Sequence, residues 1–246
     1  VYFSNVLSCG TSTASSVPCM FSDVGRERFG ADAAINREGL LDVLTRAGLT
    51  VLWRDNNSGC KGICDRVEVE DRSRPRPSAF CRADECYDEV LLEGLQERLD
   101  RADRDLVVVL HQKGSHGPAY YLRVPEAFKV FRPVCGSNQL EKCPREEIVN
   151  AFDNTIVYTD YVLAKTIALL RQNSARFDTA LLYVSDHGES LGESGGVYLH
   201  GLPYAMAPIE QKHVPMLVWL SEGFRARFHI DQACLAAKRH EAYSHD

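Results

Sequence analysis

Apolar residues recur along the chain with helical spacing in some stretches and as short runs in others. Leu40, Leu44 and Ala47 follow steps of four and three residues, which predicts a short helix that Gly48 ends. A longer stripe with the same spacing predicts a helix of about 25 residues with one face toward the core. That stripe consists of Ile148, Phe152, Ile156, Thr159, Leu163, Ile167 and Leu170.

Short apolar runs separate the helical stretches and predict β-strands. These runs are residues 1–5, 49–53, 106–110, 180–184 and 214–220. Another helix is expected over residues 88–101, and a weak one near residue 232. Strands that alternate with helices are typical of a largely parallel sheet with helices on both faces. The pattern therefore predicts an α/β fold, an α/β/α sandwich with a mostly parallel central sheet.

Residues 56–79 follow neither period. They contain glycine, serine, alternating charges and the run Arg74-Pro75-Arg76-Pro77, so we expect them to form a surface excursion. No internal repeat and no linker between domains is evident in the sequence. We therefore expect residues 1–246 to form a single domain.

The composition fits a globular protein and narrows the classes of partner. The chain has 246 residues, of which 45% are hydrophobic, and this is enough to build a core. A net charge of −6 does not favour nucleic acid as a partner. No apolar run approaches the ~18 residues that a membrane helix needs, so we expect the chain taken alone to be soluble.

Nine cysteines are many for a typical cytosolic enzyme. Eight of them form pairs at short spacing: Cys9/Cys19, Cys60/Cys64, Cys81/Cys86 and Cys135/Cys143. Zinc knuckles are the alternative, but the CxxC pairs that they use are absent. We favour local disulfides with Cys234 left over, which require an oxidising compartment. Because the sequence shows neither a signal peptide nor an initiating Met, we expect it to be a fragment of a longer exported protein.

A carboxylate and an imidazole follow the predicted strand at residues 180–184. Asp186 and His187 are adjacent there, and both can reach a divalent metal from a tight turn. Oxygen and nitrogen ligands suit Zn²⁺ or Mn²⁺. An isolated Asp-His pair is more often a carboxylate that orients a histidine. The metal interpretation therefore depends on the other histidines of the chain.

Two other histidines lie in loops that contain glycine. His116 follows the predicted strand at residues 106–110, and His200 comes thirteen residues after His187. Because the carboxyl ends of parallel strands gather ligands at one edge of a sheet, three such histidines favour a metal or phosphate site. His111 lies so close to the strand end that a structural role is an equal alternative.

Hydroxyl residues follow the first predicted strand. Thr11, Ser12 and Thr13 precede a short helix that would run toward Met20. Such residues are most often helix caps. Thr13 could instead be a nucleophile, because a bound metal lowers the pKa of a hydroxyl and a helix N-terminus can hold the phosphate that it attacks.

Six motifs in order resemble one family. They are Ser8-Cys9-Gly10-Thr11-Ser12-Thr13-Ala14, Val17-Pro18-Cys19-Met20-Phe21-Ser22, Trp53-Arg54-Asp55-Asn56-Asn57-Ser58, His116-Gly117-Pro118-Ala119-Tyr120, Ser185-Asp186-His187-Gly188-Glu189-Ser190-Leu191-Gly192-Glu193 and Val197-Tyr198-Leu199-His200-Gly201. Together they resemble the periplasmic catalytic domain of the lipid A phosphoethanolamine transferases, which include colistin-resistance enzymes. The resemblance covers nearly the whole chain and implies an alkaline phosphatase/sulfatase-like fold.

The resemblance implies a zinc enzyme. The residue corresponding to Thr13 is the family's nucleophile and a metal ligand, and Asp186 and His187 bind the same Zn²⁺. The resemblance implies one Zn²⁺ and leaves the presence of a second Zn²⁺ open. The family's remaining ligand, a glutamate, would precede Val1, so the first metal-ligand segment and the N-terminal membrane helices are expected to lie outside the fragment, as are its last C-terminal elements.

The resemblance also implies roles for residues around the metal. His116 and His200 correspond to residues that bind the substrate phosphate or a second zinc and assist proton transfer. Asn57, Ser58 and Lys61 correspond to residues near the phosphoethanolamine group. These five residues are therefore the expected substrate contacts, and two of them are also expected to be catalytic.

The implied reaction transfers phosphoethanolamine from phosphatidylethanolamine to a lipid A phosphate through a covalent intermediate on Thr13, which confers polymyxin resistance. The implied location is the periplasmic face of the bacterial inner membrane, reached through the N-terminal helices of the parent protein, which is expected to be a monomer. A zinc-dependent phosphodiesterase or sulfatase-like hydrolase of the same superfamily is the nearest alternative. A non-catalytic module pinned by disulfides is the alternative from another class.

Overall fold

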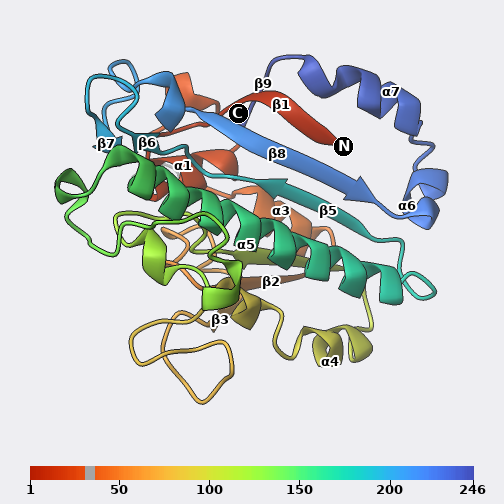
Figure 1. Ribbon diagram of the computed structural model, residues 1–246. Coiled ribbons are helices and arrows are strands. Elements are labelled where there is room, and N and C mark those ends of the chain that lie inside the picture. Colours follow the sequence, from red (N-terminus) through yellow and green to blue (C-terminus); the bar gives the residue numbers. More distant parts are fainter. Residues whose placement is uncertain (31–36) are drawn as a thin grey trace. The chain divides into compact units, whose positions relative to one another are not determined.

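The computed structural model describes residues 1–30 and 37–246 (Figure 1). These residues form two compact units, each of which is described by itself. The first unit comprises Val1–Met20, Val24–Phe29 and Leu163–Asp246. The second comprises Phe21–Asp23 and Gly30–Val162, so helix α5 (Arg145–Gln172) contributes residues to both. The expectation of a single domain stays a prediction.

The first unit is built on a four-stranded sheet in the order β5-β8-β1-β9. The strands are β1 (Tyr2–Leu7), β5 (Ala180–Val184), β8 (His213–Leu220) and β9 (Tyr243–Ser244). Figure 1 shows β8 between β1 and β5, and it runs antiparallel to both. Parallel neighbours need a crossover, usually a helix. Because the segment between β5 and β8 holds only short strands and a 3₁₀ turn, β8 returns antiparallel, unlike the mostly parallel sheet that was expected.

The helices of the first unit are short apart from α5. They are α1 (Thr13–Met20), α6 (Glu222–Arg227) and α7 (Gln232–Ala237), with 3₁₀ turns η1 (Arg26–Arg28), η6 (Ile209–Gln211) and η7 (Lys238–His240). The expected helix near residue 232 is confirmed, and the Asp231 side chain caps it. Phe3, Val6 and Val214 form the buried centre of this unit. A small two-stranded sheet pairs β6 (Ser190–Leu191) with β7 (Tyr198–Leu199).

The second unit contains a parallel sheet in the order β3-β2-β4. Its strands are β2 (Thr50–Asp55), β3 (Glu68–Asp71) and β4 (Leu106–His111), and its helices are α3 (Leu40–Arg46) and α4 (Leu95–Asp100). Its 3₁₀ turns are η2 (Asp88–Leu91), η3 (Tyr120–Leu122), η4 (Glu126–Phe128) and η5 (Leu140–Lys142). This sheet confirms the parallel α/β pattern. β4 extends to His111, which is therefore the last residue of the strand rather than part of the loop.

Two expectations for the second unit were wrong in detail. Residues 56–79 contain strand β3, whose sequence Glu-Val-Glu-Asp is largely exposed and shows no apolar alternation. The single helix expected over residues 88–101 is divided into η2 and α4. Gly94 lies between them with φ +71°, a left-handed conformation that a helix interior does not contain. The long helix α5 is confirmed, with 28 residues.

All four expected disulfides are present: Cys9–Cys19, Cys60–Cys64, Cys81–Cys86 and Cys135–Cys143. Cys234 is free and exposed. Cys60, Cys64 and Asp65 come close enough together to resemble a metal site. Because the two sulfurs are bonded to each other, this group is a disulfide and not a metal centre. Among the described residues, no helix is both long enough and apolar enough to cross a membrane.

Candidate active site

Two loops of the first unit emerge at the same edge of its sheet. The end of β1 pairs with the start of β8, at Leu7 and His213. The end of β5 pairs with the same part of β8, at Val184 and Met216. The loop that leads into Thr13 and the loop that carries Asp186 therefore leave the sheet on either side of β8. This places the two predicted motifs next to each other, although they are far apart in the sequence.

The three residues expected to bind a metal come together at this edge. Thr13 Oγ1 lies 3.4 Å from His187 Nε2. Asp186 Oδ2 lies 3.6 Å from the same nitrogen. Thr13 and His187 are both buried. A hydroxyl, a carboxylate and an imidazole therefore converge within a few ångströms of one another.

The polar atoms around His187 leave these groups available to a metal ion. His187 Nδ1 lies 2.8 Å from the Gly188 carbonyl oxygen, so it donates its proton there and Nε2 keeps a lone pair. Asp186 Oδ2 is enclosed and makes no hydrogen bond to any described residue. A buried carboxylate oxygen without a donor costs free energy unless a cation compensates it. The donor set of oxygen and nitrogen is one that Zn²⁺ binds.

A second histidine borders this group. The rings of His187 and His200 have centroids 4.2 Å apart. His200 Nδ1 lies 2.7 Å from Glu189 Oε2, and this hydrogen bond raises the pKa of His200. The ligand atoms of His187, Glu189 and His200 all lie within 4.8 Å of one another, so these residues could also hold a metal ion. Glu189 belongs to one of the six sequence motifs, and no role was predicted for it.

The loop before Thr13 is held by several contacts. Thr11 Oγ1 donates to the Leu202 carbonyl oxygen at 2.6 Å, and the Cys9–Cys19 disulfide spans the loop. A Cβ at Gly10 would lie 2.9 Å from the Ser16 backbone nitrogen, which is too close, so only glycine fits there. Thr13 is the first residue of α1, and its side chain does not serve as a cap for that helix in any hydrogen bond described. The alternative that Thr11, Ser12 and Thr13 only cap the helix therefore does not account for the Thr13 hydroxyl, which can act as a nucleophile.

One further histidine at this edge was not anticipated. The Cys9 N–H group donates to His245 Nδ1 at 3.2 Å. Burial lowers the pKa of His245 to about 4, against the opposing effects of the Asp186 carboxylate and the Ser185 backbone. The imidazole is therefore neutral near pH 7. No sequence signal marks this residue, because its contacts are with loops more than 200 positions away on one side and about 60 on the other.

The other predicted site residues belong to the second unit. His116 Nδ1 lies 2.7 Å from the Gly117 carbonyl oxygen. Asn57 donates from its side chain to the Gln112 carbonyl oxygen at 3.1 Å, which ties the loop after β2 to the loop after β4. Lys61 donates to the backbone and side-chain oxygens of Ser58 at 2.7 and 2.8 Å. The structure thus brings Asn57 toward the loop of His116, and the grouping of these four residues with Thr13 stays a prediction.

His111 is part of a buried network in the second unit. Its Nδ1 lies 2.7 Å from Asp55 Oδ2, which also accepts from Trp53 Nε1 at 2.8 Å. The amides of Asn57 and Gly59 donate to the other carboxylate oxygen. Burial raises the pKa of Asp55, but these hydrogen bonds outweigh it and hold the pKa at about 2. The carboxylate therefore organises both the end of the strand and the loop after it.

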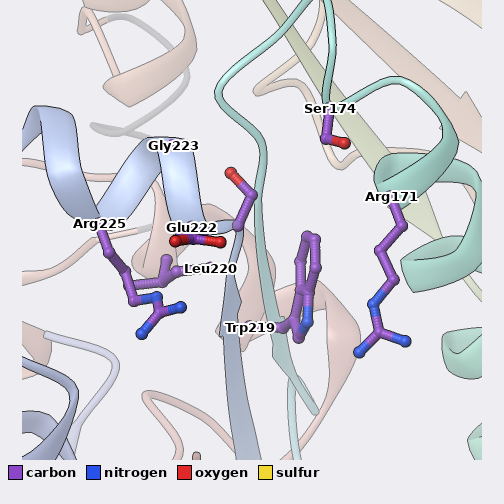
Figure 2. Close-up of a pocket in the computed structure, with 8 residues that line it drawn as sticks. Arg171, Ser174, Trp219, Leu220, Glu222, Gly223 and Arg225 are labelled. Atoms are coloured by element: carbon purple, nitrogen blue, oxygen red, sulfur yellow. The ribbon is translucent and has the colours of Figure 1, made fainter.

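A cavity of about 590 Å³ lies at the other end of the first unit's sheet (Figure 2). It adjoins the end of β8, where Leu220 pairs with Ala180. Figure 2 shows Arg171 and Arg225 on either side of Trp219. Its described lining has no histidine, cysteine or threonine. The negative charge of Glu222 balances one of the two positive charges of the arginines. The candidate chemistry therefore lies at the Thr13 edge and not in this cavity.

Comparison with known proteins identifies the family of the chain. The model of the sulfatase family matches residues 1–246. The chain is 52% identical over 247 residues to phosphoethanolamine transferase EptA of Escherichia coli K12. This match covers 100% of the chain and 45% of that protein. It is 47% identical over 224 residues to phosphatidylethanolamine transferase Mcr-1 of Escherichia coli, covering 88% of this chain and 41% of that protein.

A solved structure extends the likeness to the fold. The soluble domain of lipooligosaccharide phosphoethanolamine transferase A from Neisseria meningitidis matches with a TM-score of 0.93 at 46% identity. The match covers 100% of this chain and 73% of that one. The expected alkaline phosphatase/sulfatase-like α/β fold is therefore confirmed. The fold is that of the sulfatase family of enzyme domains.

The chain belongs to the sulfatase family and, within it, to the phosphoethanolamine transferases. It spans less than half the length of the curated relatives that it matches.

Proposed function

We propose that this chain is the catalytic part of an enzyme that transfers phosphoethanolamine from phosphatidylethanolamine to a lipid A phosphate. One observation carries the proposal: Thr13 Oγ1 and Asp186 Oδ2 both approach His187 Nε2, at 3.4 and 3.6 Å. A hydroxyl is a poor nucleophile unless a neighbouring group activates it. The three residues supply a nucleophile and the ligands for an activating metal in one place. The relatives named as phosphoethanolamine transferases support this choice of reaction.

Thr13, Asp186 and His187 would hold one Zn²⁺ together with a ligand from another part of the parent protein. Bound there, zinc would lower the pKa of the threonine hydroxyl and stabilise charge on the transferring phosphoryl group. Asp186 contributes an enclosed oxygen that no described donor satisfies, and His187 contributes Nε2. Glu189 and His200 are the residues that would take a second ion beside His187.

Thr13 carries the transferring group through two displacements. Its Oγ1 attacks the phosphorus of phosphatidylethanolamine, the bond from phosphorus to the diacylglycerol oxygen breaks, and phosphoethanolamine remains as an ester on Thr13. A phosphate oxygen of lipid A then attacks the same phosphorus and releases Thr13. Thr13 opens helix α1, and a helix N-terminus favours a phosphate group near its free amides.

Histidines would supply the proton that the diacylglycerol oxygen takes up. Glu189 raises the pKa of His200, which keeps that ring protonated over a wider range of pH and suits it to act as an acid. His116 is the second candidate for this role and for contact with the phosphate. Asn57, Ser58 and Lys61 would contact the phosphoethanolamine group, with amide and hydroxyl groups for its polar atoms.

The setting of the reaction follows from its substrates. Both lipids belong to membranes, so the parent protein would work at the periplasmic face of the inner membrane, where four disulfides are stable. Adding an ethanolamine cation masks negative charge on lipid A. Weaker attraction of cationic peptides, and hence polymyxin resistance, is the expected consequence.

The test is a search for the covalent intermediate. The chain is incubated with zinc and a short-chain phosphatidylethanolamine in detergent, and intact-mass and peptide mass spectrometry locate any phosphoethanolamine adduct. We expect the adduct on Thr13 and its loss in Thr13→Ala. Ser12→Ala is the matched control, because it removes a neighbouring hydroxyl from the same turn and should keep the adduct.

The products separate the proposal from its alternatives. A hydrolase would release free phosphoethanolamine and leave lipid A unmodified, whereas a transferase moves the group onto a lipid A acceptor. A non-catalytic module would show no adduct and no release. An adduct that persists in Thr13→Ala would overturn the assignment of the nucleophile.

A further inference from the structure

His245 lies at the candidate active site, but it has no role in the proposed reaction. It directly follows β9, which pairs with the end of β1. Its backbone N–H donates to the Leu7 carbonyl oxygen at 3.1 Å. This bond places the residue at the sheet edge from which the loop before Thr13 departs.

The hydrogen bonds of the imidazole fix its protonation. His245 Nδ1 accepts from the Cys9 N–H group at 3.2 Å, so this nitrogen carries the lone pair. In a neutral ring the proton then resides on Nε2. That nitrogen is enclosed. The ring thus binds the loop before Thr13 through Nδ1.

The ring also lies near Ser16, a residue that joins the two loops of the site. Ser16 Oγ lies 3.4 Å from His245 Nδ1 and donates to the Asp186 carbonyl oxygen at 2.5 Å. Ser16 belongs to helix α1, which Thr13 opens. Because the single hydroxyl proton of Ser16 goes to the Asp186 carbonyl oxygen and Nδ1 carries a lone pair, Ser16 contacts the ring by packing and reaches Asp186 by its hydrogen bond. His245 therefore lies against the residue that links helix α1 to the loop of a proposed metal ligand.

We propose that His245 is a positioning residue of this site, which ties the loop before Thr13 to the loop that carries Asp186 and so holds the two side chains at the separation that a shared metal ion requires. The expected effect on metal binding rests on the proposed function. The link between the two loops is present in the protein without metal. Partners that orient metal ligands typically change metal affinity by roughly 10- to 100-fold when they are removed.

Two substitutions separate hydrogen bonding from packing. His245→Leu keeps an apolar side chain of similar bulk but removes both ring nitrogens. His245→Asn is smaller, yet its Oδ1 can accept from the Cys9 N–H group in place of Nδ1. A role in packing predicts that Leu is tolerated better than Asn, whereas a role in hydrogen bonding predicts the reverse. His240→Leu is the matched control, because His240 is an exposed histidine of the same segment.

The first measurement is hydrogen exchange of the metal-free chain, followed in peptides that cover residues 9–16 and 185–188. We expect His245→Leu to speed exchange in both peptides, His245→Asn to restore most of the protection in the first, and His240→Leu to change neither. Unchanged exchange in His245→Leu, or equal loss in the control, would overturn the tie. This result does not depend on whether the chain is a transferase.

The second measurement is zinc affinity, by competition with a chromophoric chelator well below the melting temperature of each variant. We expect His245→Leu to weaken zinc binding by roughly 10- to 100-fold and His245→Asn by clearly less. Faster exchange with unchanged zinc affinity would overturn the positioning role. If the unsubstituted chain binds no zinc, the proposed function fails, and the exchange experiment still decides whether His245 ties the loops.

Discussion

Each unit of the protein contains a histidine whose Nδ1 lies 2.7 Å from a carboxylate oxygen. In the first unit the pair is His200 with Glu189, and in the second it is His111 with Asp55. The two pairs share their chemistry but differ in what surrounds them. His200 faces the ring of His187, at a centroid distance of 4.2 Å, beside the proposed metal ligands.

The carboxylate of the second pair is anchored to the backbone around it. Asp55 accepts from Trp53 Nε1 and from the amides of Asn57 and Gly59, in addition to His111. It therefore shapes the end of β2 and the loop that follows. A carboxylate–imidazole pair alone does not identify an active site. The neighbouring groups distinguish the two pairs: the Asp55 pair organises a loop, and the His200 pair, beside the proposed metal ligands, is the one for which we propose a chemical role.

The largest expected effect concerns the rate of transfer. Without the ring of His200, the leaving oxygen would lose its proposed proton donor, and a positioned acid typically contributes at least about 100-fold. We therefore expect His200→Ala to slow formation of the Thr13 adduct by roughly 100-fold, measured by quenched-flow mass spectrometry. His229→Ala, at an exposed histidine of the same unit, should leave the rate unchanged. A loss of less than about threefold in His200→Ala would remove the chemical role of this pair.

The second pair should matter most for stability. Asp55→Ala leaves Trp53 Nε1, His111 and two backbone amides without their acceptor in a buried place, so we expect a loss of about 3 kcal/mol in the free energy of unfolding. Urea denaturation followed by tryptophan fluorescence measures it. Asp103→Ala, at an aspartate whose side chain is 85% exposed, should change stability by less than about 0.5 kcal/mol. Equal effects of the two substitutions would contradict the architectural role.

The same carboxylate predicts an acid dependence of stability. The pKa of Asp55 is about 2 in the folded chain, below its ordinary value of 3.8, so the unfolded chain takes up the proton first as the pH falls. Asp55 therefore contributes stability that is fully present above about pH 5 and is lost as the pH falls through about 2, amounting to about 2 kcal/mol. Asp55→Asn should flatten the fall in unfolding free energy between about pH 5 and 2. An unchanged slope would show that Asp55 does not stabilise the folded state as an anion.

The smallest expected effects compare the loops next to each pair. Gly201 follows His200 with φ +93°, and Gly114 follows His111 three residues later with φ +56°. A Cβ would meet no atom within 4 Å at either position, so only backbone strain opposes alanine. We expect Gly201→Ala and Gly114→Ala each to cost about 1 to 2 kcal/mol in thermal unfolding. A stabilising effect at either position would indicate that its loop can relax out of the left-handed conformation.

Part of this arrangement could be predicted from the sequence. Thr13, Asp186 and His187 follow predicted strands, and the rule that strand ends gather ligands brought them together correctly. The stripe of apolar residues in α5 and the short spacing of the cysteines were equally informative. These signals are local, because each depends on residues within one or two turns or on the end of a single strand.

Other features depend on contacts that no local pattern contains. Strand β3 is mostly charged and exposed, so its pairing with β2 leaves no alternation in the sequence. Gly94 divides a helix that the apolar spacing joined. His245 reaches Cys9 across 236 positions through the pairing of β9 with β1. The grouping of His116, Asn57, Ser58 and Lys61 with Thr13 stays a prediction from the family resemblance.

The zinc content of two double variants, one in each unit, tests the proposed metal centre most directly. Asp186→Asn with His187→Ala removes two proposed ligands, and Asp55→Asn with His111→Ala removes the anchored pair. Each protein is loaded with zinc, dialysed and analysed by elemental mass spectrometry. We expect the first variant to lose the zinc that the unsubstituted chain retains and the second variant to keep it. Retention of zinc by the first variant, or its loss only from the second, would contradict the claim that Thr13, Asp186 and His187 form the metal centre.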